Sequence, residues 1–153
     1  MKIISLWQPW ASLVALGLKQ NKTRSWYTKY HGPLGIHASK KIVPFHKLFN
    51  ELTFEQRNYI MQKICGAYGD YDKMPGSIIA VSNLIDVVTV EKVIPELTWL
   101  ERACGDYSPG RFAWRLKDIV HLEEPIPAKG HQQLWEFDVE GTIAEQERGL
   151  SHG

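Results

Sequence analysis

The first fifty of the 153 residues contain no aspartate and no glutamate. These fifty residues carry eight lysines and arginines, whereas the remainder of the chain carries ten basic and seventeen acidic side chains. A formal net charge of +1 therefore conceals an N-terminal part at +8 and a C-terminal part at −7. Eight cations without one acid exceed what ordinary surface charge explains, so the separation predicts a positive surface for an anionic partner.

Three further absences narrow the class of protein. Cys65 and Cys104 are the only cysteines and form no C-x-x-C pair, which predicts free thiols in a reducing compartment. The six histidines lack ligand spacing, so we expect no metal site and no cofactor. No apolar run approaches the roughly 18 residues that cross a bilayer, and the N-terminus lacks the pattern of a secretory signal. We therefore expect a cytoplasmic protein that does not enter a membrane.

The composition is typical of a folded domain. Hydrophobic residues make up 44% of the chain and charged residues 23%, which suits a chain that buries a core. Internal repeats and dividing linkers are absent from the sequence. We expect one domain over residues 1–140, followed by a tail at 141–153 that resembles no motif and frays.

Short elements are predicted in the basic N-terminal part. We expect a strand at 2–6, a helix at 9–18, and strands at 22–27 and 34–39. Alternation in the segment 22–27 places Lys22, Arg24 and Trp26 on one face. In the next strand Leu34, Ile36 and Ala38 face the core, while Gly35, His37 and Ser39 point the other way. A hairpin of these two strands, of undetermined register, would gather the polar side chains into one basic, aromatic-rimmed cleft: Lys19, Lys22, Arg24, His37, Ser39 and Lys40.

The remaining elements follow from capping and alternation. A helix turn or two is expected at 43–50, and the capping box Thr53 to Gln56 opens a helix to residue 64. That helix is expected to bury Phe54, Tyr59, Ile60 and Ile64. One long, bent strand is predicted at 77–93, broken near Asn83, and a second capping box opens a short helix at 98–105. Alternating strands are predicted at 111–122 and 134–139, and loops at 66–72 and 74–76.

Two blocks of residues resemble a known family. The first is SLWQPWASLVALGLK at 5–19 with RSWYT at 24–28, and the second is GDYSPGRFAW at 105–114 with EPIP at 124–127 and LW at 134–135. Together they resemble the ASCH domain, the activating-signal-cointegrator homology family, in its bacterial and phage branch. The resemblance covers residues 3–138.

The resemblance implies an α+β, PUA-like fold, which is a small β-barrel of about five to six mostly antiparallel strands with helices packed around it. It also implies a cleft that receives RNA or a nucleotide. The family pattern reads Gly-x-Lys-x-x-Glu-x-Arg, and this chain departs from it because Lys22 occupies the acidic position. One branch hydrolyses the acetyl amide of N4-acetylcytidine with a lysine, a threonine and a glutamate. Only its lysine maps here, onto Lys19.

Each candidate site residue has a structural alternative. The nucleic-acid-binding candidates are Gln8, Lys19, Lys22, Arg24, Trp26, His37, Ser39, Lys40, Tyr107 and Arg111. Gln8 precedes a helix and can cap it, while His37 alone is more often a hydrogen-bonded structural histidine. The segment 106–111 reads locally as a turn. Trp7, Trp10, Trp114 and Trp135 are expected in the core rather than in base stacking.

Two classes of function remain open at this point. In a binding module the cations hold the phosphates of single-stranded RNA or of a nucleotide or nucleoside, and an aromatic ring stacks on a base. In a hydrolase that is a ribonuclease, His37 would take the 2′-hydroxyl proton and Lys19 or Arg24 would stabilise the phosphorane. In an amidohydrolase, Lys19 would act together with an acidic partner. Clustered cations could also lower the pKa of Lys19 towards that of a general base. The missing carboxylate at Lys22 favours phosphate binding, and the oligomeric state is left open.

Overall fold

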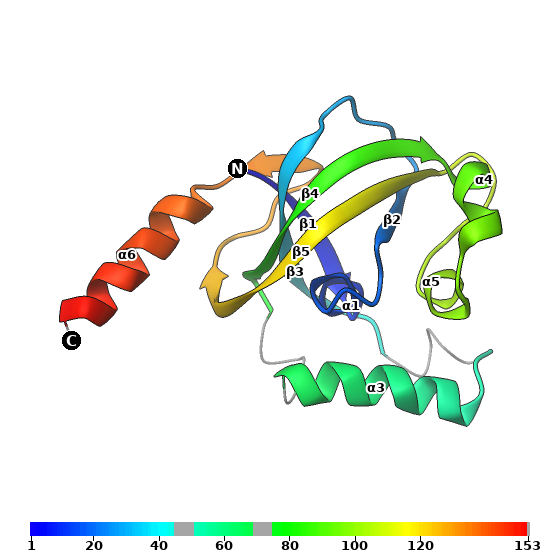
Figure 1. Ribbon diagram of the computed structural model, residues 1–153, viewed down its shortest axis with the longest axis horizontal. Coiled ribbons are helices and arrows are strands. Elements are labelled where there is room, and N and C mark those ends of the chain that lie inside the picture. The colour runs from blue at the N-terminus through cyan, green and yellow to red at the C-terminus, as the bar shows by residue number, and fades with distance from the viewer. Residues whose placement is uncertain (45–50, 69–74, 153) are drawn as a thin grey trace.

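The computed structural model describes residues 1–44, 51–68 and 75–152. Six strands form one sheet in the order β2-β5-β4-β3-β1-β6 (Figure 1). Their bounds are β1 Lys2–Gln8, β2 Asn21–Arg24, β3 Gly32–Ile42, β4 Ser77–Thr89, β5 Phe112–Pro127 and β6 Leu134–Glu136. The neighbours β1 and β3 are parallel, and the other pairs are antiparallel. The predicted α+β class is therefore confirmed, but the barrel is open because the short edge strands β2 and β6 do not pair with each other.

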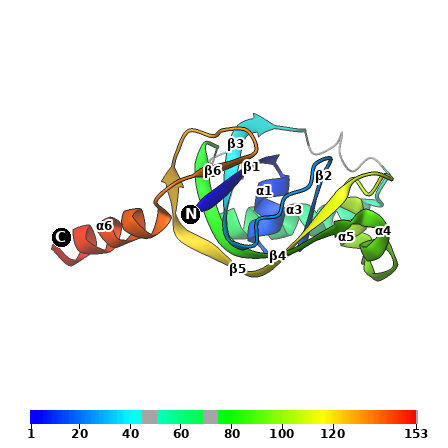
Figure 2. The same cartoon turned by 90° about the horizontal axis from the view of Figure 1, so that it is seen from above.

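The sheet curves around its first helix, α1 (Trp10–Ala15), which contacts β1, β3, β4 and β5 (Figure 2). The main core lies between them and includes Leu6, Val14, Ile36 and Trp114. Four further helical segments are α3 Phe54–Tyr68, α4 Val90–Val93, η2 Ile94–Glu96 and α5 Trp99–Ala103, and the chain ends in α6 Val139–His152. Trp114 has no exposed surface, so the curved sheet encloses a core large enough to hold a whole indole ring.

Helix α1 is shorter than the predicted helix because Gly17 ends it. Gly17 has φ +73, the left-handed conformation that favours glycine. Its amide donates to Val14, and the Leu18 amide donates to the Leu13 carbonyl at 3.0 Å. This pair of bonds is the Schellman arrangement, which satisfies the last carbonyls of a helix and reverses the chain. Lys19 therefore follows directly on a fixed turn.

Helix α3 begins with the predicted capping box and buries only half of the predicted face. The Gln56 amide donates to Thr53 Oγ1, and the Thr53 amide donates to Gln56 Oε1, each at 3.1 Å. Ile60 and Ile64 are buried against Leu13, as expected. Phe54 is 71% exposed and Tyr59 lies against Trp99 at 6.0 Å, so their predicted burial is wrong. The turn of the helix from Ile60 to Ile64 makes this apolar contact, and the rings of Phe54 and Tyr59 lie outside the contact. The helix also continues to Tyr68, into the predicted loop at 66–72.

Three predicted segments lie partly outside the described residues. Residues 45–50 of the helix turn expected at 43–50 fall there. So do residues 69–74, which hold the end of the loop expected at 66–72 and the start of the turn expected at 74–76.

The long strand β4 is bent, as predicted, and its pairing with β5 shifts at three places, one of them between Val81 and Asn83. It ends at Thr89, where α4 begins, rather than continuing to residue 93. The predicted hairpin of 22–27 with 34–39 is wrong, because β2 pairs with β5 and is separated from β3 by two strands. The physical reason lies in two tryptophans. Trp114 of β5 packs edge-on against Trp26 at 4.7 Å and donates its indole N–H to the Trp26 carbonyl at 3.4 Å.

The C-terminal segment forms α6, where we expected a frayed tail. Asp138 accepts the Gly141 amide at 2.9 Å and so caps the first turn. Val139 and Ile143 pack on the apolar cluster that holds Trp135. Beyond this contact the helix extends away from the sheet (Figure 1). Within the described residues, none of the helices combines the length and apolar character that crossing a membrane requires.

Candidate nucleic-acid site

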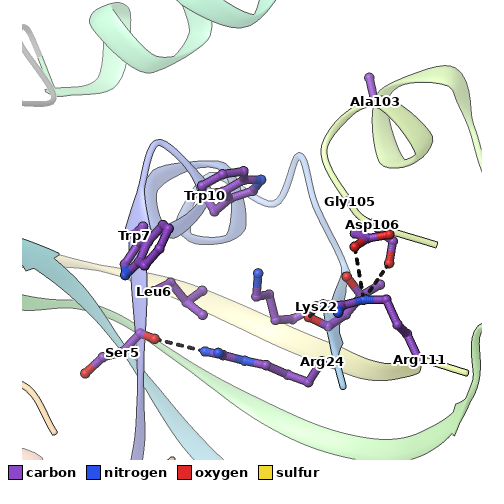
Figure 3. A pocket seen from close by; sticks show the side chains of 11 residues that line it. Ser5, Leu6, Trp7, Trp10, Lys22, Arg24, Ala103, Gly105, Asp106 and Arg111 are labelled. Carbon is purple, nitrogen blue, oxygen red and sulfur yellow. Dashed lines mark hydrogen bonds and ion pairs between the residues drawn. The ribbon is translucent and has the colours of Figure 1, made fainter. Parts of the chain in front are cut away.

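A cavity of about 540 Å³ opens where β1 approaches β2 across the curved sheet (Figure 3). We call it the cation cavity. Its lining comprises Ser5, Leu6, Trp7, Trp10, Lys22, Thr23, Arg24, Ala103, Gly105, Asp106 and Arg111. Three of these side chains are cationic and one is acidic. The predicted side chains Lys22, Arg24 and Arg111 therefore meet in one place, although they do so through the pairing of β2 with β5.

Lys22 extends from β2 into the space beneath Trp7 and Trp10 (Figure 3). Its Nζ lies 5.7 Å from the centre of the Trp10 ring. Burial, followed by the charges of Arg24, Lys19 and Arg111, lowers the pKa of Lys22 to about 7. Near neutral pH this lysine is therefore present in both its charged and its neutral form.

The two arginines of the cavity are held in different ways. Arg24 reaches from β2 across to β1, where its Nη2 donates to the Ser5 carbonyl at 2.9 Å. Its buried Nε has no hydrogen-bond partner. Arg111 Nε donates to the Asp106 carbonyl at 3.1 Å and lies 3.5 Å from the Asp106 carboxylate. Arg111 is thus partly neutralised, whereas Arg24 retains an unused donor at the floor of the cavity.

Asp106 is the carboxylate of this cavity. The Ser108 amide donates to its Oδ1 at 3.0 Å, and the Ser108 hydroxyl also bonds to it. These hydrogen bonds from Ser108 are the main reason that the pKa of Asp106 is lowered. The carboxylate therefore stays charged and partners Arg111. This role could not be predicted from the sequence, because the segment 106–111 reads locally as a simple turn.

Lys19 lies behind the cavity rather than on its lining. It has no exposed surface, and the described part of the chain offers its Nζ no hydrogen-bond partner. The Nζ lies 5.6 Å from the centre of the Tyr107 ring, and a Cβ added at Gly105 would come within 2.7 Å of it. Burial lowers the pKa of Lys19, against the opposing influence of Glu101 and Cys104. Lys19 fits here because residue 105 is a glycine, which has no side chain to occupy the space.

Glu101 and Tyr107 complete the surroundings of Lys19. Half of the second predicted capping box is present, since the Glu101 amide donates to Thr98 Oγ1 at 3.2 Å, whereas the Glu101 carboxylate bonds elsewhere. The Glu101 carboxylate accepts the Gln20 amide at 3.0 Å and Asn21 Nδ2 at 2.7 Å, so it anchors the chain just after Lys19. Tyr107 packs beside Val90 and Val93, and its buried hydroxyl has no partner. Tyr107 therefore supports Lys19 and does not line the cation cavity.

A second cavity of about 1190 Å³ adjoins the first and shares Ser5, Trp7 and Arg24 with it. We call it the histidine cavity. Its other lining residues are Trp26, His37, Ser39, Lys40, Pro75, Gly76, Ser77, Pro127, Ala128, Lys129, Gly130, His131, Gln132 and Gln133. Among the residues that the structure describes, its lining contains no acidic side chain. The two cavities meet at Ser5, Trp7 and Arg24, and we refer to them together as the groove.

His37 is held by a closed set of hydrogen bonds. Its Nε2 donates to the Ala128 carbonyl at 2.7 Å, because a carbonyl oxygen only accepts. The neutral ring then accepts at Nδ1 from Ser5 Oγ at 3.1 Å, while Trp135 Nε1 donates to the same hydroxyl at 3.1 Å. Burial lowers the pKa of His37. His37 therefore has no free ring nitrogen with which to accept a proton from a substrate.

The other predicted residues are dispersed. Ser39, whose buried Oγ has no partner, lines the histidine cavity together with Trp26 and the exposed Lys40. Gln8 is fully buried and lines neither cavity. Its side chain donates to Ser12 Oγ at 2.8 Å and accepts the Ser12 amide at 3.0 Å. Gln8 therefore takes the structural alternative named for it and caps α1, because its side-chain oxygen accepts the backbone amide of Ser12 in the first turn of the helix.

Sequence reasoning missed two tryptophans of the groove. Trp7 is 48% exposed and lines both cavities, and its ring lies 3.8 Å from Lys41 Nζ. Trp10 is partly exposed and lines the cation cavity. The available signal was the alternation in β1, since Ser5 and Trp7 share the face opposite Leu6 and Gln8. Trp114 and Trp135 are buried, as predicted.

The remaining predictions concern the two cysteines and metal binding. Cys65 and Cys104 are free thiols, and burial raises the pKa of Cys104 to about 11. Among residues 1–44, 51–68 and 75–152, the structure shows no group of histidine, cysteine or acidic side chains that could hold a metal ion.

An open, curved sheet wrapped around a short helix, with a cationic cavity between β1 and β2, defines an α+β domain of the PUA-like kind. The chain belongs to the ASCH domain family, whose sequence model matches residues 4–126. This family is associated with RNA binding.

Two curated relatives and one solved structure illustrate the similarity. The chain is 27% identical over 135 residues to activating signal cointegrator 1 of Homo sapiens, and equally to that of Mus musculus. The match covers 88% of this chain, which spans about a fifth of the length of these relatives, 22% in each case. The crystal structure of ASCH from Zymomonas mobilis has 16% identity and a TM-score of 0.54, and covers 95% of this chain and 93% of that one. At this identity the structural match shows the fold alone.

Proposed function

We propose that the chain binds single-stranded RNA along the groove formed by the cation cavity and the histidine cavity. The observation that supports this best is the surplus of positive charge at the cation cavity. Lys19 Nζ and Arg24 Nε are buried without a partner among the described residues, and the pKa of Lys22 is lowered by burial and then by its cationic neighbours. Cations that repel one another at a cavity are stabilised by an anion, and a phosphate matches the guanidinium fork of Arg24.

The shape of the groove suits a strand better than a single phosphate. The shared residues Ser5, Trp7 and Arg24 connect a cavity rich in cations to a larger one that contains amide, hydroxyl and imidazole groups. Trp7 exposes its ring at the junction, where an unpaired base can stack on it. In this arrangement the phosphates are held by Arg24, Lys22 and Arg111. A base lies in the histidine cavity, against the side chains near Ser39. A free nucleotide would use the same groups, with fewer contacts.

The hydrolase alternatives receive less support from the same geometry. His37 is the predicted base, and both of its ring nitrogens are engaged with Ser5 and Ala128. Lys19, the one position that maps on the amidohydrolase branch, is fully buried. A ribonuclease needs a group that accepts the 2′-hydroxyl proton within reach of the phosphate. Binding without cleavage is therefore the function that we propose.

The test is the salt dependence of RNA affinity. We expect fluorescence anisotropy with a short single-stranded RNA to show an affinity that falls steeply with salt, because each neutralised phosphate releases counterions. Arg24→Gln should weaken binding roughly tenfold to a hundredfold, the usual effect of losing a hydrogen bond to a charged group. It should also make the logarithmic salt slope shallower by about one unit.

The matched control is Lys29→Gln, because Lys29 is an exposed lysine of the same basic part that lines neither cavity. We expect this variant to bind as the unmodified protein does. An affinity that does not depend on salt, or equal losses in the two variants, would contradict the proposed groove.

A further inference from the structure

Lys22 differs from the other lysines of the groove in how it is held. The structure describes no hydrogen bond or ion pair of its ammonium group among the residues it covers. The side chain lines the cation cavity and is half-buried, whereas Lys19 is closed off from it and Lys40 is exposed. Lys22 is therefore the lysine whose amine a molecule in the cation cavity would meet.

The surroundings of Lys22 favour a neutral amine. Lys19, Arg24 and Arg111 place positive charge around it, and the acid Asp106 is engaged with Arg111 and Ser108. A lysine of ordinary pKa is neutral in only about one of several thousand molecules at pH 7, whereas one with a pKa of about 7 is neutral in half of them. The neutral amine is the form that attacks carbonyl carbons.

The same surroundings select the reaction partner. Arg24 lies two residues from Lys22 on β2, and Arg111 lies beside them across from Thr23, whose carbonyl accepts its Nη2 at 3.3 Å. Two guanidinium groups beside one amine suit a molecule that carries a phosphate close to an electrophilic carbon. The Trp10 ring at 5.7 Å provides an apolar wall on the other side. A cavity of about 540 Å³ accommodates a small phosphorylated compound.

We infer that the Lys22 amine is a reactive group that forms an imine with a phosphate-bearing aldehyde held by Arg24 and Arg111. The Nζ lone pair attacks the carbonyl carbon, and a proton passes from nitrogen to oxygen to give a carbinolamine. Loss of that oxygen as water then leaves the C=N bond, so no oxidant or reductant is required. This chemistry goes beyond RNA binding, although it uses the same cavity. It also gives a role to the lysine that occupies the acidic position of the family pattern.

Trapping the imine tests this inference directly. The full chain is treated with limiting pyridoxal 5′-phosphate at pH 7.5, reduced with borohydride and mapped by mass spectrometry. We expect Lys22 to carry the main adduct, at least about tenfold above the exposed Lys29 and Lys40, because its neutral fraction is far larger. Inorganic phosphate should compete, and neutral pyridoxal should label Lys22 roughly tenfold less. Equal labelling of Lys22 and the exposed lysines would overturn the inference, as would equal labelling of Lys22 by pyridoxal.

Two variants serve as controls. Lys22→Arg keeps the positive charge but cannot form an imine, so the main adduct should disappear. Lys22→Met tests the same point if the arginine does not fit, and circular dichroism verifies that each variant folds. Unchanged total labelling in a folded variant would contradict the proposal. A further comparison uses RNA whose 3′ ribose has been oxidised to a dialdehyde. Preferential reaction with it over pyridoxal phosphate would indicate a nucleic-acid aldehyde, and the reverse a small phosphorylated aldehyde.

Failure of this inference is distinguishable from failure of RNA binding. RNA affinity without an adduct at Lys22 contradicts the imine alone, whereas an adduct without RNA affinity contradicts the proposed function alone. The pH dependence separates them as well. Imine formation should increase from pH 6 to 8 as Lys22 loses its proton, while phosphate binding by the same lysine should weaken.

Discussion

The two adjoining cavities differ in how the polar groups at their centres are satisfied, although Ser39 Oγ in the histidine cavity is buried without a partner among the described residues. In the histidine cavity Trp135, Ser5, His37 and Ala128 form a closed chain of donors and acceptors. In the cation cavity several cations converge. Its one described acid, Asp106, forms an ion pair with Arg111 and with none of the other described cations. Satisfied polar groups stabilise a fold, whereas unpaired buried charge destabilises it unless a ligand is present. The difference supports a mainly structural role for the hydrogen-bonded chain around His37 and the binding role that we propose for the cation cavity.

The largest expected effect tests the structural side of this comparison. His37→Ala removes the partner of the Ser5 hydroxyl and of the Ala128 carbonyl and also leaves a void beside Trp135, whose ring lies 5.3 Å from the imidazole. We expect a loss of about 2–4 kcal/mol in the free energy of unfolding, measured by urea denaturation. His131→Ala is the matched control, because His131 is exposed, lines the same cavity and also contacts Trp135, at 5.2 Å. Equal losses in the two variants would mean that the hydrogen-bonded chain contributes nothing.

The next effect has the opposite sign and concerns Lys19. Lys19→Met keeps most of the side-chain volume in its fully buried site and removes an ammonium that has no partner. We expect unfolding to require about 1–3 kcal/mol more, since replacing buried charge by an apolar group of similar size is often stabilising. RNA affinity should fall, because one of the charges near the cation cavity is lost. A destabilised variant with unchanged RNA affinity would show that Lys19 is a structural residue.

The sequence predicted this site through the wrong arrangement of strands. Lys22, Arg24 and Arg111 meet because β2 pairs with β5, whereas we expected a hairpin of β2 with β3. Alternation gave the face that these residues occupy, but alternation does not identify a partner strand. The choice of partner depends on the contact of Trp26 with Trp114, which are 88 residues apart. The capping box at Thr53 and the N-cap at Thr98 were predicted correctly because their bonds join residues three positions apart, whereas the Glu101 carboxylate bonds residues 80 and 81 positions away.

The same distinction between local and distant contacts explains the remaining errors. The burial of Lys19 depends on Gly105, which no pattern near residue 19 reveals. The exposure of Trp7 follows from the open edge of the groove, because in a closed core its large ring would be buried. Helix α6 was missed because the apolar residues that it packs against the core, the buried Val139 and the partly buried Ile143, are too few to give a helical pattern.

Changes of pH should test the two cavities separately. Lowering the pH should change the stability of the fold through His37, and raising it should change RNA affinity through Lys22. His37 is neutral in the fold with a lowered pKa, so the unfolded chain takes up a proton first as the pH falls. Its contribution to stability should be complete above about pH 6.5 and be lost as the pH falls through that value. His37→Gln should flatten this part of the stability profile, and the slope that remains includes His121, whose pKa is also lowered by burial. An unchanged slope would mean that His37 titrates freely in the fold.

On the alkaline side, RNA affinity should respond through Lys22. A bound phosphate favours the charged form, so affinity should be greatest below the pKa of about 7 and decline as the pH rises through it. Lys22→Arg should remove this decline, because arginine stays charged throughout the range. Anisotropy titrations from pH 6 to 9 at constant ionic strength measure both proteins. A decline of equal size in the arginine variant would assign the effect to another group.

The smallest expected effect concerns the cation at the rim of the histidine cavity. Lys40 is exposed, and the described structure gives its ammonium no hydrogen bond or ion pair, so water screens its charge. Lys40→Ala should leave the free energy of unfolding within about 0.5 kcal/mol of the original value. If RNA passes from one cavity into the other, the variant should bind a strand of several nucleotides more weakly, with a salt slope shallower by about one unit. A mononucleotide bound in the cation cavity alone should lose no affinity. A loss of equal size for the mononucleotide and for the longer strand would show that Lys40 acts through the general field of the basic surface, and that the histidine cavity is not part of the path of the strand.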